Sequence, residues 1–199
     1  MPVATKGYTE NTPKNYLIDS ATVFKNVTYA VGPGFTGTLI GATQGGVVVT
    51  IEQNYRNPEV DGTTHLQGKV KGNVILESAT AQVTIKLKEL TAENLRGSLN
   101  GTMVDALSTE APTGYKKITT KRVVASGDYL TNIAVVGTLA GSAEPVIFII
   151  DNPLNTNTTE VATEDNGEAV LELIYVAHAT AAQAIADEFP WHILFPAVV

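Results

Sequence analysis

Residues 79–88 alternate between apolar and polar side chains without a break. The apolar positions are Ala79, Ala81, Val83, Ile85 and Leu87, and the polar positions are Thr80, Gln82, Thr84, Lys86 and Lys88. Successive side chains of a β-strand point to opposite faces of a sheet, so a period of two is typical of a strand. The segment predicts a β-sheet with one packed face and one face in water.

The other apolar segments are rich in β-branched residues and are separated by polar loops. Strands are expected within residues 17–30, 47–56, 114–125, 132–140, 144–151 and 169–179, and a second small helix near 180–187. The run at 144–151 is apolar throughout and should be covered on both faces. About seven strands and one or two short helices indicate a mainly β fold, a β-sandwich or barrel with one short α-helix packed on the sheet. We expect a single domain at 17–199, preceded by a flexible polar arm at 1–16 that is ordered only against something else.

Composition argues against several classes of function. The net charge of −7 is unfavourable for a groove that binds nucleic acid, because such a groove needs clustered basic residues. The chain has no cysteine, which excludes disulfides, thiolate metal sites and cysteine nucleophiles. No window is long and apolar enough for a membrane span, and the start of the chain does not read as a secretion signal. The protein is therefore expected to be made and folded in the cytoplasm.

No motif in the chain predicts catalysis or a cofactor. Gly32, Gly34 and Gly37 match a G-x-G-x-x-G pattern, but a β-branched segment follows where a nucleotide-binding helix would have to begin. The three histidines, His65, His178 and His192, lack the spacing of metal ligands. The weak alternatives are a histidine trio assembled by the fold, and a calcium site in the polar loop, built from Asp151, Asn155, Asn157 and Glu160. We expect no catalytic, cofactor-binding or metal-binding residue.

The sequence KELTAENLRGSLNG, at residues 88–101, predicts a helix of about two turns. Thr91 is a good N-cap, and Glu93 lies in the first turn, where the helix dipole favours an anion. Leu90 and Leu95 occupy the positions of a hydrophobic staple, and Leu95 and Leu99 share one face. The Asn100-Gly101 pair supplies a left-handed stop. A helix this short is not stable alone, so we expect the leucines to dock it on the sheet.

Several features indicate association. Residues 57–72 form a long polar loop with two glycines near its end, and loops of this length inside compact domains are usually functional. The segment at 169–177 has apolar residues on both faces, and the C-terminal end is hydrophobic. Exposed strand edges and apolar ends are either covered or used for assembly. A subunit of a closed ring would use them through head-to-tail contacts.

Two long blocks resemble one protein family. GATQGGVVVTIEQNYRNPEVDGTTHLQGKVKG, followed by SATAQVTIKLKELTAENLRGSLNG, is similar to the major tail protein, or tail tube protein, of long-tailed (siphovirus-type) bacteriophages and prophages. The stretch from LTNIAVVGTLAG to LELIYVAHA, with PWHILFP, resembles the second half of that family. The resemblance covers residues 17–196 in several blocks in the expected order. The segments TTHLQGKVKG and TTEVATEDNGE depart from it as loop variants.

The resemblance implies a structural virion protein that is not an enzyme and needs no cofactor. Its fold would be a β-sandwich flanked by a helix, and six copies would form a ring whose inner strands join into a barrel. Stacked rings would conduct DNA into the host without binding it specifically. Partners would be further copies of the chain, the tape measure protein and the terminator protein, with no membrane contact, and the location would be the virion tail, assembled in the bacterial cytoplasm. Six copies at −7 each give −42 per ring, and an acidic channel wall would repel phosphate, although the charge could equally lie outside.

The same resemblance assigns two groups of residues to assembly. The ring-stacking loop would include Asn57, Glu59, Asp61, His65, Lys69 and Lys71. The helix at the subunit boundary would include Leu90, Thr91, Glu93, Leu95, Arg96 and Leu99. Two alternatives stay open: the tube protein of a phage-derived secretion or tailocin device and, from another class, a carbohydrate-binding β-sandwich. The latter would need exposed aromatics beside a polar pocket, whereas Trp191 lies in an apolar segment.

Overall fold

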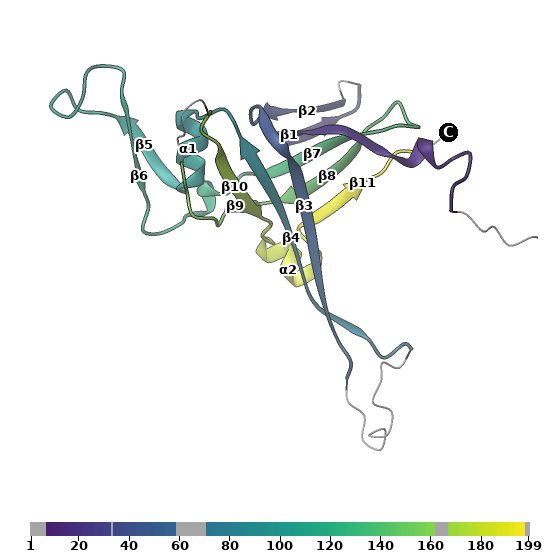
Figure 1. The fold of residues 1–199 in the computed structure, drawn as a ribbon. Helices are drawn as coiled ribbons and strands as arrows, with labels where there is room; N and C mark the ends of the chain where they lie inside the picture. Colours follow the sequence, from purple (N-terminus) through teal and green to yellow (C-terminus); the bar gives the residue numbers. More distant parts are fainter. Residues whose placement is uncertain (1–6, 33, 59–70, 162–166, 198–199) are drawn as a thin grey trace, which may run out of the picture.

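The chain folds into two antiparallel β-sheets that enclose a common core, with a separate hairpin and two short helices (Figure 1). The computed structural model describes residues 7–32, 34–58, 71–161 and 167–197. The first sheet has the order β11-β8-β7-β1-β2 and the second has the order β3-β4-β10-β9. Their strands are β1 (Leu17–Ala30), β2 (Gly34–Leu39), β3 (Thr43–Arg56), β4 (Ile75–Leu87), β7 (Asn132–Leu139), β8 (Val146–Asp151), β9 (Leu154–Asn155), β10 (Leu171–Val176) and β11 (Trp191–Leu194). This arrangement confirms the expected mainly β, sandwich-like fold.

The core lies between the two sheets. The first sheet contributes Val23, Ile133, Val135 and Ile150, and the second contributes Ala81, Val83, Ile85, Leu87, Leu171, Leu173 and Tyr175. The apolar face predicted for residues 79–88 is this core face, because Val83, Ile85 and Leu87 are fully buried. On the opposite face Gln82 and Thr84 are half-buried and Lys86 is exposed. The predicted alternation is confirmed.

The strand β8 is buried on both faces, as its continuous apolar run predicts. Ile150 belongs to the core between the sheets, whereas Ile147 and Ile149 form a second cluster with Val27 and Ala134 on the other face of the five-stranded sheet. The first sheet is therefore apolar on both faces, which is unusual for an antiparallel sheet in water.

A side chain of β7 compensates for an irregularity in β1, at the point where the pairing of β1 with β2 shifts. The register of β1 and β2 shifts between Lys25 and Thr28, and Asn26 takes a left-handed conformation at φ 53°. Asn132 accepts a hydrogen bond from the Val27 amide at 2.6 Å and donates one to its carbonyl at 2.9 Å. Its carboxamide therefore replaces a main-chain partner and keeps the bulged strand in the sheet.

Three further elements stand outside the two sheets. The helix α1 (Ala92–Ser98) lies beside the hairpin of β5 (Gly101–Asp105) and β6 (Lys116–Thr120). The helix α2 (Ala181–Ala186) begins at Thr180, whose side chain forms a capping box with Gln183. Both helices lie where the sequence predicts them. The described residues contain more strands than the expected seven, and β5 was missed because its five residues lack a clear alternation.

The polar arm is partly ordered against the body. Residues 7–16 contain a short 3-10 helix, η1 (Pro13–Asn15). A second 3-10 helix, η2 (Ser126–Asp128), lies between β6 and β7. Ala140 donates a hydrogen bond to the Tyr16 carbonyl at 2.9 Å, and Gly141 donates one to the Lys14 carbonyl at 2.8 Å. These contacts attach the end of the arm to the turn after β7. The rest of the predicted arm, residues 1–6, lies outside the described residues.

Candidate assembly surfaces

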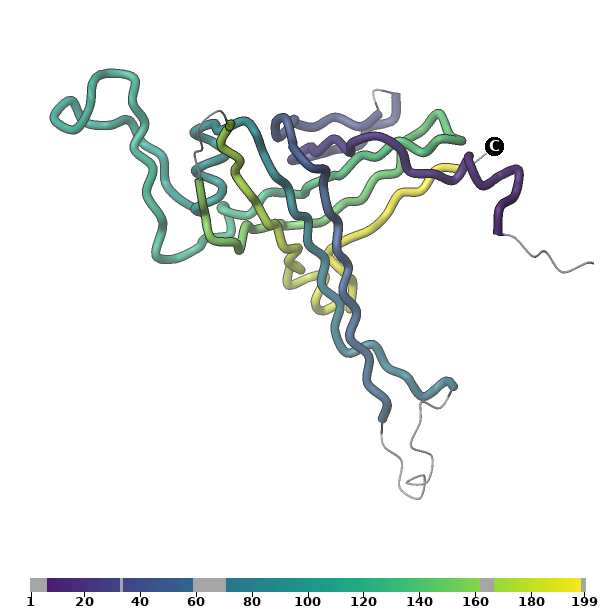
Figure 2. Tube along the Cα trace, viewed as in Figure 1, coloured from purple at the N-terminus to yellow at the C-terminus, as the bar shows by residue number. Residues whose placement is uncertain are grey.

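The hairpin of β3 and β4 extends beyond the sheet to which it belongs (Figure 2). The strand β10 pairs with β4 only from Gln82 to Leu87, and Ala177 adds one hydrogen bond to Ala81. Beyond this point residues 52–56 pair only with residues 75–80, so the hairpin continues as a two-stranded ribbon. We call these two segments the ribbon.

The ribbon carries exposed apolar side chains at its outer end. Tyr55 is 54% exposed, Ile75 is 46% exposed, and Val74, just before β4, is 45% exposed. A two-stranded hairpin is marginally stable by itself in water. Exposed apolar side chains at the end of a projecting two-stranded ribbon favour contact with another surface.

Only part of the predicted stacking loop falls within the described residues. Asn57 and Lys71 are both exposed where the chain leaves and re-enters the ribbon, and Asn73 donates a hydrogen bond to the Pro58 carbonyl at 2.9 Å. Glu59, Asp61, His65 and Lys69 lie outside the described residues. The role of this loop in stacking stays a prediction.

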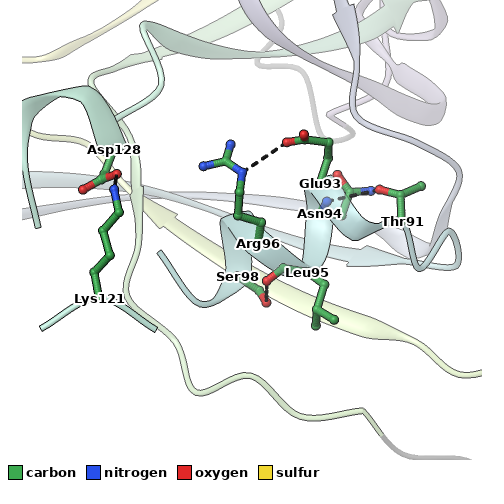
Figure 3. Close-up of polar contacts among 8 residues, drawn as sticks. All are labelled: Thr91, Glu93, Asn94, Leu95, Arg96, Ser98, Lys121 and Asp128. Atoms are coloured by element: carbon green, nitrogen blue, oxygen red, sulfur yellow. Dashed lines mark hydrogen bonds and ion pairs between the residues drawn. The ribbon is translucent and has the colours of Figure 1, made fainter. Parts of the chain in front are cut away.

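The helix α1 begins as its sequence predicts (Figure 3). The Asn94 amide donates a hydrogen bond to the Thr91 hydroxyl at 3.1 Å, which is the expected N-cap. Arg96 pairs with Glu93 at 3.2 Å on the exposed side. Asn100 has a left-handed φ of 46°, so the predicted stop is also present.

The leucines do not dock this helix as predicted. Leu90 is 50% exposed, and Leu95 and Leu99 are only half-buried. The buried residues of α1 are instead polar: Asn94 is 6% exposed and Ser98 is 3% exposed. The expectation of leucine docking on the sheet was wrong, because the helix turns its leucine side away from the core between the sheets.

Polar contacts hold α1 to the segments that follow β2 and β4 and to the strand β9. Asn94 donates hydrogen bonds to the carbonyls of Ile40, at 3.1 Å, and Glu89, at 3.3 Å. At the other end, Asn155 of β9 donates to the Ser98 carbonyl at 2.7 Å and accepts from the Ile174 amide at 2.9 Å. The buried carboxamides satisfy main-chain groups that would otherwise lose their partners on burial.

The Asn155 contacts also bear on the calcium alternative. Its carboxamide oxygen is engaged by the Ile174 amide, and its nitrogen donates to Ser98 and, at 3.4 Å, to the Asn157 carbonyl. Within the described part of the chain, no three His, Asp or Glu side chains gather as metal ligands. His65, part of the histidine alternative, lies outside that part.

A shallow apolar groove separates α1 from the β5–β6 hairpin. It has a volume of about 540 Å³ and is lined by Leu90, Ala92, Leu95, Tyr115 and Ile118, among others. The hairpin extends outward from this groove and carries Val104, 56% exposed, and Leu107, 65% exposed. The helix that was predicted at a subunit boundary therefore borders an exposed apolar surface, which includes a hairpin of which the sequence indicated only the second strand.

A second apolar hollow lies on the outer face of the five-stranded sheet. It measures about 410 Å³ and is lined by Val27, Tyr29, Phe35, Asn132, Ile149, His192 and Leu194. Tyr29 and Phe35 lie side by side at its rim, with ring centroids 4.9 Å apart. Trp191 is half-buried and packs against Phe189 and the core. The exposed aromatic pair thus borders an apolar hollow and not the polar pocket that a sugar would need.

Several of the described ionisable groups form ion pairs. Lys121 forms a hydrogen bond with Asp128 (Figure 3), which lowers the pKa of that carboxyl with help from the Ala125 amide. The ammonium of Lys88 lowers the pKa of Glu168 in the same way. Burial raises the pKa of Tyr175 to about 12, against a smaller opposing effect of Arg96. These contacts stabilise the fold and present no paired acid and base in a cleft.

The G-x-G-x-x-G segment runs from the turn after β1 into β2, to which Gly34 and Gly37 belong. Gly32 and Gly34 have φ values of 102° and 76°, and a strand stands where a nucleotide-binding helix would have to begin, as the sequence predicts. No helix among the described residues is long and apolar enough to cross a membrane.

No protein-family model matches the chain, and no curated protein matches it significantly.

Proposed function

We propose that this protein is a structural subunit that assembles with copies of itself into stacked rings, forming a tube that conducts DNA. The observation that carries the proposal is the ribbon, which leaves its sheet and exposes Tyr55 and Ile75, with the exposed Val74 beside them. The resemblance of the sequence to phage tail tube proteins supplies the ring and the tube. The proposed location is the virion tail.

The distribution of exposed apolar surface favours head-to-tail contact between copies. The ribbon, the β5–β6 hairpin and the N-terminal arm leave the body in different directions (Figure 1). Contacts between unlike surfaces of identical copies generate rings when the rotation closes, whereas a two-fold contact would pair each surface with itself. Three separate projections suit a subunit with neighbours on several sides.

The charge of the chain suits a channel for DNA. A net charge of −7 per copy, repeated around a ring, gives a field that repels phosphate if the carboxylates face the lumen. Repulsion lets DNA pass without binding. The tube of a phage-derived injection device would use the same contacts, and a neighbouring tape measure gene without sheath genes would favour the flexible phage tail.

Substitution in the ribbon tests the proposal. The double variant Tyr55→Ser, Ile75→Ser removes two exposed apolar side chains outside the core, so the monomer should melt as the wild type does. Each side chain is about half exposed, and its burial between subunits is worth roughly 1 kcal/mol, so the concentration needed for assembly should rise at least about tenfold. Sedimentation velocity and negative-stain microscopy measure this threshold.

The matched control is Val31→Ser. Val31 is 90% exposed in the turn between β1 and β2, away from the ribbon. Its substitution should leave the assembly threshold unchanged. Equal thresholds for the ribbon variant and the wild type would remove the ribbon from the interface and leave the proposal without its main support.

A further inference from the structure

The junction between α1 and β5 contains a dipeptide that the backbone geometry itself requires. Asn100 has φ 46°, a left-handed conformation that few residues other than Asn and Gly adopt readily. A Cβ atom at Gly101 would lie 2.5 Å from the Thr119 carbonyl oxygen of β6, so only glycine fits there. The fold thus requires glycine at 101 and favours asparagine or glycine at 100.

An Asn-Gly pair is chemically reactive, because glycine has no side chain to hinder its nitrogen. The main-chain nitrogen of Gly101 can lose its proton and bond to Cγ of Asn100, while the Cγ–Nδ2 bond breaks and ammonia leaves. Water then opens the cyclic imide at either carbonyl and gives aspartate or isoaspartate. No oxidant or reductant is needed, and water is the only co-reactant.

The structure restrains both reacting groups. The Asn100 carboxamide donates a hydrogen bond to the Asn155 carbonyl at 2.8 Å, which fixes its orientation. Gly101 is buried and paired in register with Thr120, at the start of the β5–β6 hairpin. The reaction breaks the hydrogen bond to Asn155, because the nitrogen that donates it leaves as ammonia, so we expect reaction to need local opening of the junction.

We propose that Asn100 is a deamidation site that the folded junction protects, so that local opening of α1 and β5 sets the rate of reaction. A cavity of about 30 Å³ lined by Asn100, Arg96 and Tyr175, among others, is large enough to hold water for the hydrolysis step. The proposal does not depend on the function proposed above.

Deamidation would release the end of α1. The product carboxylate has no proton to donate to the Asn155 carbonyl, so two acceptors face one another where a hydrogen bond stood. The isoaspartyl product also adds one main-chain carbon between α1 and β5. In aged molecules, α1 should therefore be held less firmly to the rest of the fold. This helix borders the exposed groove.

Peptide mapping by mass spectrometry tests the proposal in mildly alkaline buffer. In urea, Asn100 should deamidate as fast as Asn166, which is also followed by glycine and lies outside the described residues. In the folded wild type, Asn100 should react at least about tenfold more slowly than in urea. Equal rates with and without urea, or no reaction at Asn100 in urea, would overturn the proposal.

Two variants test whether opening of the junction sets the rate. Thr91→Ala removes the cap of α1 at a distance from the reacting atoms and weakens the helix by about 1 kcal/mol, so the folded variant should deamidate about fivefold faster. An unchanged rate would refute gating by α1. Asn100→Gly keeps the left-handed backbone but has no carboxamide, and a mass gain persisting in this peptide would place the reaction at another residue.

Discussion

Replacement of Asn155 by alanine should destabilise the fold more than any surface substitution, although the side chain is polar. Asn155 is 2% exposed, and its carboxamide joins the end of α1 to β10. The variant leaves the Ser98 carbonyl and the Ile174 amide without these partners. Each main-chain group that loses its partner on burial costs about 1–3 kcal/mol, so the loss of two partners should lower the free energy of unfolding by about 2–6 kcal/mol.

Equilibrium unfolding in urea measures this change. The fluorescence of Trp191, the only tryptophan and one that packs against the core, reports the transition, with far-UV circular dichroism as a second probe. Asn54→Ala is the matched control, because Asn54 donates an exposed hydrogen bond to Ser78 at 3.2 Å. The control should change the free energy of unfolding by less than about 0.5 kcal/mol. Equal effects of the two substitutions would refute the inference that α1 is held by buried amides.

Three further substitutions test other contacts of the fold. Thr91→Ala should lower the free energy of unfolding by about 1 kcal/mol in the same urea assay, because it removes the side-chain cap of α1; no change would mean that the cap contributes nothing. Burial raises the pKa of Tyr175 from 10.0 to about 12, because the folded protein disfavours the phenolate. The unfolded chain therefore loses this proton first, so the contribution of Tyr175 to the free energy of unfolding is complete below pH 10 and is lost as the pH rises through 12. Urea titrations across this range should show the wild type losing up to about 3 kcal/mol more than Tyr175→Phe, and parallel losses would contradict the assignment. Gly141→Ala should release the N-terminal arm, because a Cβ atom would lie 2.7 Å from the Lys14 carbonyl oxygen; limited proteolysis should cut residues 7–16 faster than in Gly127→Ala, whose Cβ meets nothing within 4 Å.

Local patterns of the sequence predicted the local features of the fold. The alternation at 79–88 predicted which face of β4 is buried, since that face is decided by period alone. Thr91 and Asn100 were identified as the start and stop of α1 because capping depends on residues close in the chain. The continuous apolar run of β8 likewise indicated burial on both faces.

Contacts between distant residues could not be predicted in this way. The sequence gives no sign that Asn94 and Asn155 are buried, because asparagine is usually exposed, and only the fold brings them to main-chain groups far away in sequence. The leucines of α1 were expected to be buried, whereas the helix presents Leu90 and Leu95 to the groove beside the β5–β6 hairpin. The sequence did not predict the pairing of β5 with β6. The apolar surface beside these leucines was therefore not predicted either.

The central claim is that the chain assembles with itself into rings and tubes. Negative-stain microscopy of the purified protein at rising concentration tests it most directly. We expect rings or tubes of uniform bore, which the ribbon variant Tyr55→Ser, Ile75→Ser forms only at higher concentration. A protein that stays monomeric and dispersed at the highest attainable concentration would rule out assembly into a tube.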